Sequence, residues 1–151
     1  MKIKSWLFHT YFLIRRPMTL GVRAVVLDEA EQSVFLVRHT YVKGWHLPGG
    51  GVERNETFLQ ALIKELREEG NIELSAMPEL FGLYKNTHAS NRDHVALYIC
   101  RSYRQTAERL PDREIAEAQF FPLDSLPDGV TAATKRRLNE VMMQAQPDEM
   151  W

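Results

Sequence analysis

Three glutamates, Glu65, Glu68 and Glu69, follow the glycine run Gly49–Gly51 and are the residues of this sequence best suited to chemistry. Their i, i+3, i+4 spacing places them on one face of a helix. Carboxylates held this close repel one another and raise each other's pKa unless cations bind there. Oxygen ligands of this kind suit Mg²⁺ or Mn²⁺, and a glycine-rich turn that leads into a helix can receive phosphate oxygens. The pattern therefore indicates a site where a metal ion and a phosphate group meet.

The elements that position these glutamates can be predicted from the spacing of apolar residues. Residues 56–69 have apolar side chains at helical intervals, so this segment is expected to be the helix that carries the glutamates. Two apolar, β-branched segments at 19–27 and 33–39 enclose a polar turn, which predicts a hairpin. A short strand is expected at 45–47, where the following proline and glycines stop it.

The rest of the chain predicts a single α/β (α+β) domain. Further strands are expected at 80–88, 94–103 and 118–123, and a second main helix at 131–144 with Thr131 as its N-cap. The 151 residues are 44% apolar, which suits one hydrophobic core, and no repeat or linker divides them. We therefore expect a mixed β-sheet sandwiched between α-helices.

A longer motif surrounds the glutamates. Residues 50–72 read GGVERNETFLQALIKELREEGNI and resemble the Nudix box, which is Gly, five residues, Glu, seven residues and then Arg-Glu-apolar-any-Glu-Glu-any-Gly-apolar. Seven of its nine specified positions match: Gly50, Glu56, Glu65, Leu66, Glu68, Glu69 and Ile72. Segments 45–50 and 114–123 also resemble parts of this family, so the likeness covers roughly residues 19–144.

Two positions depart from the motif. Lys64 stands where the family has Arg, and Asn71 stands where it has Gly. Asparagine is the next best residue at a left-handed helix C-cap, and Asn55 is expected to adopt a similar conformation in the turn before the helix. Lysine keeps the positive charge of Arg but loses its bidentate geometry. Because every acidic position is intact, we expect these changes to tune the site rather than abolish it.

The resemblance implies a Nudix fold and hydrolysis of a pyrophosphate bond in a nucleoside diphosphate derivative, a small-molecule nucleotide. It further implies that Glu65, Glu68, Glu69 and the carbonyl of Gly49 hold Mg²⁺, with Mn²⁺ as the alternative ion. Glu65 is expected to be catalytic as well. Relatives take the general base either from the box or from a loop, so Glu68 is favoured and Glu114 is kept as a second candidate. The alternative for Glu114 is a surface carboxylate in the acidic stretch 112–117.

Other positions have two interpretations each. Glu56 either fixes the loop against Lys64 or a backbone donor, or has a direct role. Arg23 lies in an apolar strand and needs a partner, which is either a substrate phosphate or an internal carboxylate. Tyr41 and His46 precede the glycine loop and are candidate substrate contacts. Ordinary structural roles are the favoured interpretation for both side chains.

Residues 1–18 are expected to form an N-terminal arm or helix outside a Nudix domain at 19–147. This arm is rich in aromatic and aliphatic residues, so we expect it to dock either on its own domain or across a homodimer. Peripheral contact with a membrane is the remaining alternative.

Bulk properties narrow the class of protein. The net charge of −1 does not call for a nucleic-acid partner, and no apolar run approaches the roughly 18–20 residues that span a bilayer. The single cysteine, Cys100, agrees with a cytoplasmic location. Two functional alternatives stay open: a non-catalytic Nudix-fold module that binds a nucleotide or a protein, and a hydrolase that removes a 5′ pyrophosphate from RNA. The lack of a basic excess argues against the second. No residue downstream of the box assigns a particular nucleoside diphosphate derivative.

Overall fold

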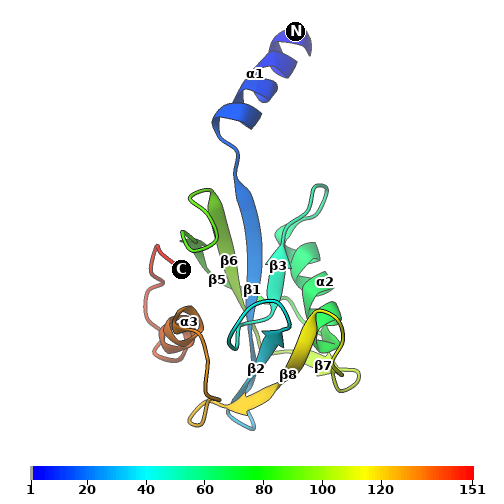
Figure 1. Cartoon of the computed structure of the whole chain (residues 1–151), viewed down its shortest axis with the longest axis vertical. Coiled ribbons are helices and arrows are strands. Elements are labelled where there is room, and N and C mark those ends of the chain that lie inside the picture. The colour runs from blue at the N-terminus through cyan, green and yellow to red at the C-terminus, as the bar shows by residue number, and fades with distance from the viewer. Residues whose placement is uncertain (1) are drawn as a thin grey trace.

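The computed structural model describes residues 2–151, with side chains described from Ser5 onward. Within these residues the chain forms three helices and eight strands, shown in Figure 1. The helices are α1 (Lys2–Arg15), α2 (Phe58–Gly70) and α3 (Ala132–Met142). The strands are β1 (Thr19–Asp28), β2 (Ser33–His39), β3 (Gly49–Gly51), β4 (Ile72–Leu74), β5 (Glu79–Lys85), β6 (Asp93–Cys100), β7 (Tyr103–Gln105) and β8 (Ile115–Pro122).

The central strand β1 organises the mixed sheet, whose order is β5-β6-β1-β2-β8 with β3 paired to β1 off this path. β1 runs parallel to β6 over residues 19–26 and antiparallel to β2 at Leu27 and Asp28. β3 pairs antiparallel with residues 21–23 of β1. The glycine run is thereby fixed against the middle of the central strand.

The two faces of the sheet pack against different helices. Because side chains alternate along a strand, Val22, Ala24 and Val26 of β1 join the core that contains Leu62 and Leu66 of α2. The intervening apolar residues of β1 join a second core that contains Leu138 and Val141 of α3. Figure 1 shows α2 and α3 on opposite sides of β1. This arrangement confirms the expected mixed sheet between helices.

Helix α2 is defined by local signals at both ends. Thr57 and Gln60 form a capping box, in which each side chain accepts a hydrogen bond from the other residue's backbone N–H. Asn71 ends the helix in the left-handed conformation with φ 52°, and Asn55 has φ 67° in the preceding turn. Both asparagine predictions are confirmed. Thr131 likewise caps α3 as predicted, through a hydrogen bond from the Thr134 N–H.

The predicted strands differ most from the structure at two places, and β5 ends at Lys85 where the strand was expected to continue to residue 88. The segment expected as a strand at 45–47 makes only isolated bridges, and β3 lies instead in the glycine run expected to end it. A side chain at Gly49 would place its Cβ 2.0 Å from the Val22 carbonyl oxygen, so only glycine allows this close pairing. The strand expected at 94–103 divides into β6 and β7, because the chain leaves the main sheet after Cys100 and pairs with β4.

The N-terminal helix α1 does not dock on its own domain, although this was one of the expected alternatives. Figure 1 shows α1 projecting from the domain beyond the start of β1. Its side chains from Ser5 to Ile14 are exposed apart from those of Thr10 and Phe12, which are partly exposed. Only residues 16–18, which include Pro17, separate α1 from β1, and this connection does not fold the helix back. None of the described helices is long and apolar enough to cross a membrane.

Candidate active site

A cleft of about 470 Å³ lies between β3, α2 and the loop that precedes β8. It brings together six of the residues predicted for the site: Tyr41, Gly49, Glu65, Glu68, Glu69 and Glu114. The other residues that line this cleft are Gly50, Arg109, Asp112 and Ile115. Residues that are far apart in sequence thus converge on the carboxylates of the box.

Glu69 is buried and fixes the glycine strand to the helix. Its Oε2 accepts a hydrogen bond from the Gly49 N–H at 2.8 Å, and its Oε1 lies 2.7 Å from Nε2 of His39. His39 is itself buried at the end of β2. One carboxylate therefore connects α2, β2 and β3, and its orientation is set before any ligand binds. Sequence analysis missed His39, because no motif links it to the box.

Glu65 packs directly against the glycine run. A Cβ at Gly50 would lie 2.5 Å from Oε1 of Glu65, so the glycine leaves the space that this carboxylate occupies. Burial, followed by the neighbouring Glu69 and Glu68 charges, raises the pKa of Glu65 to about 7, although the Lys64 charge opposes the shift. Without a metal ion, the ionised form of Glu65 therefore destabilises the folded protein.

This cost predicts a pH dependence of the free energy of unfolding. Glu65 has a pKa of about 7 in the folded protein, whereas an isolated glutamate has a pKa of 4.5. Between pH 4.5 and 7 the folded state therefore binds more protons than the unfolded state. Stability in EDTA should therefore fall as the pH rises from 4.5 to 7 and then level off, by up to about 3 kcal/mol. Urea unfolding at several pH values measures this fall in stability. Glu65→Gln should remove this part of the slope, and an unchanged slope in that variant would contradict the assignment.

Glu68 lies exposed on the same helix face, next to a loop anchored by an arginine. Nε of Arg109 donates to the Glu68 carbonyl at 2.8 Å, and Nη2 of Arg109 lies 2.5 Å from Asp112. Asp112 also accepts the backbone N–H groups of Glu114 and Ile115, both at 2.8 Å. The Ile115 N–H, Arg109 and the Glu114 N–H together lower the pKa of Asp112 to about 2.

These contacts hold the loop that brings Glu114 to the lining of the cleft. Its backbone is fixed on both sides, because the Thr40 N–H donates to the Glu114 carbonyl at 2.9 Å. Sequence analysis did not identify Arg109 and Asp112 as the residues that hold this loop. Asp112 was noted only as part of an acidic stretch, and nothing in the local sequence shows that Arg109 reaches the end of α2.

Glu56 lies outside the cleft and has the structural role that was one of its two interpretations. Its carboxylate accepts two hydrogen bonds from Nζ of Lys64, at 2.9 and 3.1 Å, and one from the Glu53 N–H at 3.0 Å. Nζ of Lys64 is also 3.8 Å from Oε1 of Glu65. Lysine at this position thus still joins the loop before α2 to the carboxylate cluster, with one charged donor in place of a guanidinium fork.

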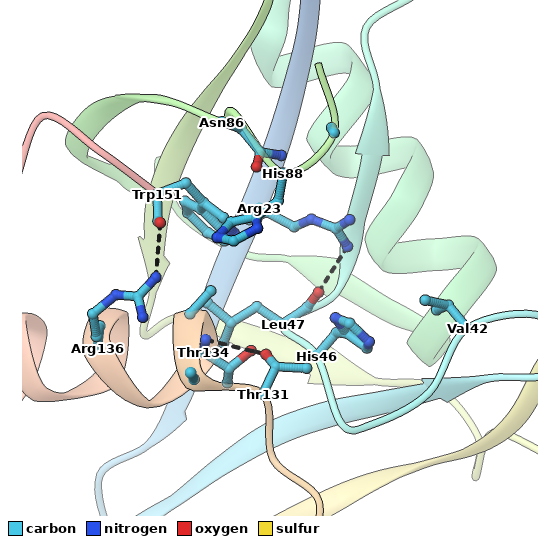
Figure 2. A pocket seen from close by; sticks show the side chains of 13 residues that line it. Arg23, Val42, His46, Leu47, Asn86, His88, Thr131, Thr134, Arg136 and Trp151 are labelled. Carbon is cyan, nitrogen blue, oxygen red and sulfur yellow. Dashed lines mark hydrogen bonds between the residues drawn. The ribbon is translucent and has the colours of Figure 1, made fainter. Parts of the chain in front are cut away.

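Arg23 and His46 line a second cleft of about 540 Å³, shown in Figure 2. Nη1 of Arg23 donates to the carbonyls of Leu47 and Gly49, at 3.0 and 3.1 Å, so its internal partners are carbonyls rather than a carboxylate. Nε2 of His46 lies 2.9 Å from the Lys43 carbonyl, and burial lowers the pKa of this histidine. Because Gly49 lines the first cleft and binds Arg23, the two clefts meet at this backbone.

The second cleft has no carboxylate among its lining residues. These are Arg23, Val42, His46, Leu47, Asn86, His88, Ala89, Thr131, Ala132, Ala133, Thr134, Arg136 and Trp151. Figure 2 shows the first turn of α3 on one side and Arg23, His88 and Trp151 on another. The combination of basic groups, small side chains and one indole ring contrasts with the acidic first cleft.

The residues of the first cleft fit a hard divalent cation. Within residues 2–151 no three His, Cys, Asp or Glu side chains are already arranged around one point as metal ligands. However, Glu65, Glu68 and Glu69 present carboxylate oxygens to one cleft, and crowding and burial raise the pKa of Glu65. A cation would offset that repulsion, and oxygen ligands of this kind suit Mg²⁺ or Mn²⁺. The Gly49 carbonyl already accepts a hydrogen bond from Arg23 and keeps a second lone pair.

Comparison with known proteins agrees with this fold. A family model described as the NUDIX domain matches residues 17–142. An ADP-ribose pyrophosphatase of Methanocaldococcus jannaschii is 30% identical over 110 residues, which cover 69% of this chain and 64% of that protein. A Bacillus subtilis protein provisionally named as an 8-oxo-dGTP diphosphatase is 27% identical over 128 residues, covering 85% and 83%. A MutT NUDIX hydrolase structure from Burkholderia pseudomallei superposes with a TM-score of 0.70 at 24% identity, covering 82% of this chain and 97% of that one.

The chain belongs to the NUDIX domain family, as the box resemblance predicted. The structural match shows the same fold. The aligned segment spans slightly under two thirds of the M. jannaschii relative, 64% of its length.

Proposed function

We propose that this protein hydrolyses the pyrophosphate bond of a nucleoside diphosphate linked to another group, with Mg²⁺ as its cofactor and Mn²⁺ as the alternative ion. The observation that carries the proposal is the first cleft, where three box glutamates face a glycine strand whose backbone lies against the helix that bears them. The cleft combines ligands for a hard cation with a narrow glycine surface that phosphate oxygens can approach closely.

Each residue of the cleft has a distinct part in this proposal. Glu65, Glu68 and Glu69 would hold the cation, which when bound would offset the charge of the phosphate oxygens and lower the pKa of the attacking water. Glu69 is kept in place by His39 and Gly49. The exposed Glu68 is our favoured base for the proton of the attacking water, and Glu114 on the loop that lines the cleft is the second candidate.

The rest of the substrate is proposed to extend into the second cleft. The two clefts share the backbone around Leu47 and Gly49, so a pyrophosphate held at the glutamates would direct one of its substituents past Arg23 and His46. Tyr41 lines the first cleft and is placed to contact the pyrophosphate side of the same substrate. The acid-free lining of the second cleft suits a substituent that carries hydroxyl or phosphate groups.

A substrate panel tests the proposal. Purified protein should release phosphate-bearing products from at least one member of a set containing ADP-ribose, nucleotide sugars, dinucleoside polyphosphates, and ordinary and oxidised nucleoside triphosphates. The activity should require Mg²⁺ or Mn²⁺. The names of the relatives make ADP-ribose and 8-oxo-dGTP the first two substrates to assay. Tight nucleotide binding without turnover in either metal would favour the non-catalytic alternative instead.

A further inference from the structure

The exposed surface of α1 has no role in the proposed hydrolysis. Six large apolar side chains of this helix are between 55% and 77% exposed: Trp6, Leu7, Phe8, Tyr11, Leu13 and Ile14. Leu7, Tyr11 and Ile14 follow an i, i+4, i+7 spacing and form one stripe. The ring of Phe12 contacts the rings of Phe8 and Tyr11, which are neighbours on the same helix. An apolar surface of this extent on one projecting element marks an interaction site.

The charged residues of α1 and of the segment that joins it to β1 are all of one sign. Residues 1–18 contain four basic residues, Lys2, Lys4, Arg15 and Arg16, and no acidic residue. The remaining residues contain the other 15 basic residues and all 20 acidic residues. The chain is therefore nearly neutral as a whole, but its charge is unevenly distributed along the sequence. The exposed apolar helix lies in the cationic segment. Basic residues precede the apolar stretch and follow it.

The length of α1 limits how it can meet a lipid bilayer. Its 14 residues extend about 21 Å, which is shorter than the hydrocarbon core of about 30 Å. The helix can therefore lie in the interface but cannot span it. Tryptophan and tyrosine favour the headgroup level, and lysine and arginine are attracted to anionic lipid. Trp6, Tyr11 and Arg15 provide these groups on α1, and Arg16 follows directly after it.

A second copy of this chain is the competing occupant. Pairing two α1 helices would bury their apolar stripes, but it would also bring together their basic residues. Neither helix has a carboxylate to offset that repulsion. Anionic lipid supplies the missing negative charge and the apolar environment together, so the charge pattern favours the membrane surface.

We propose that α1 binds the surface of membranes that contain anionic lipid, with its apolar stripe in the headgroup region and its basic ends on the lipid phosphates. This proposal is independent of the hydrolytic activity, because it uses no residue of either cleft. It places the Nudix domain at the membrane surface through a helix that the domain itself leaves uncovered.

Flotation with vesicles tests this proposal on the full chain. We expect at least tenfold more protein on vesicles of equal phosphatidylcholine and phosphatidylglycerol than on pure phosphatidylcholine. Raising the salt from about 50 to about 500 mM should weaken the binding, because screening shortens the reach of the surface charges. No binding to the mixed vesicles, or equal binding to both kinds, would overturn the proposal.

Two pairs of substitutions separate the apolar and electrostatic contributions. Leu7→Ser/Tyr11→Ser should abolish flotation, while the control Met77→Ser/Leu83→Ser, which alters exposed apolar residues of the domain, should not change it. Arg15→Glu/Arg16→Glu should reduce binding at least tenfold, and the control Arg92→Glu/Lys135→Glu should not. Sedimentation velocity without lipid provides the opposing outcome. A dimer that Leu7→Ser/Tyr11→Ser dissociates would assign α1 to a second copy and overturn membrane binding.

Discussion

Replacing Glu68 by Gln is expected to lower kcat/KM for pyrophosphate hydrolysis by about a hundredfold or more. The substitution keeps the size and polarity of the side chain but removes its negative charge and its ability to accept a proton. In the proposed mechanism this carboxylate holds the cation or receives the proton of the attacking water. Because Glu68 is exposed, its replacement should leave the melting temperature nearly unchanged. Steady-state kinetics with the best substrate of the panel measures the effect.

Three further variants make this result specific. Glu31→Gln makes the same chemical change at an exposed position in the β1–β2 turn and should retain full activity. Glu69→Gln should lose activity and also stability, because it weakens the contacts with His39 and the Gly49 N–H. If Glu68→Gln retained activity while Glu114→Gln lost it, the base would be assigned to the loop. Full activity in all the cleft variants would exclude the cleft as the active site.

The largest expected effect on stability comes from Arg137, which is 0% exposed on α3. Its guanidinium pairs with the Glu140 carboxylate at 2.9 Å and donates to the Met150 carbonyl at 2.8 Å. It also lies 4.4 Å from the centre of the Tyr84 ring. Arg137→Met would fill much of the space but leave Glu140 without its cationic partner. We expect the free energy of unfolding to fall by about 3 kcal/mol, and the melting temperature by about 6–12 °C.

Urea unfolding measures this loss against a control on the same helix. Lys135→Met changes an exposed residue two positions earlier and should alter the free energy of unfolding by less than about 0.5 kcal/mol. Arg137 also holds the chain end that carries Trp151, a wall of the second cleft. A stability of Arg137→Met equal to that of Lys135→Met would show that the buried arginine is not the anchor of this end.

The features that could be predicted from the sequence are those that depend on local spacing. The i, i+3, i+4 glutamates do share the helix face that lines the cleft, and the Asn71 cap follows from the tolerance of asparagine for positive φ. Glu56 lies just before α2 and Lys64 lies within the first two turns of this helix, so the two residues are close in sequence. Their pairing was one of the two expected interpretations of Glu56. Periodicity and turn chemistry are sufficient for such features.

The features that could not be predicted depend on contacts between distant segments. His39 reaches Glu69 from β2, and Arg109 reaches the carbonyl of Glu68 from a loop 41 residues away in sequence. The strand at the glycine run forms because β1 offers a partner, although glycine has little intrinsic preference for strands. Arg23 likewise takes backbone carbonyls as partners, which no property of its own strand indicates.

The central claim is that the glutamate cleft hydrolyses a pyrophosphate bond only with a divalent cation bound. Phosphorus-31 NMR of the preferred substrate with the intact protein tests it most directly. In EDTA the phosphorus signals of the substrate should persist, and excess Mg²⁺ should convert them to the signals of the two products of one P–O–P cleavage, which are two monophosphates when the substrate is a nucleoside diphosphate linked to another group. Glu68→Gln should slow that conversion at least a hundredfold. Cleavage that continues unchanged in EDTA, or cleavage of a bond other than the pyrophosphate, would contradict the account.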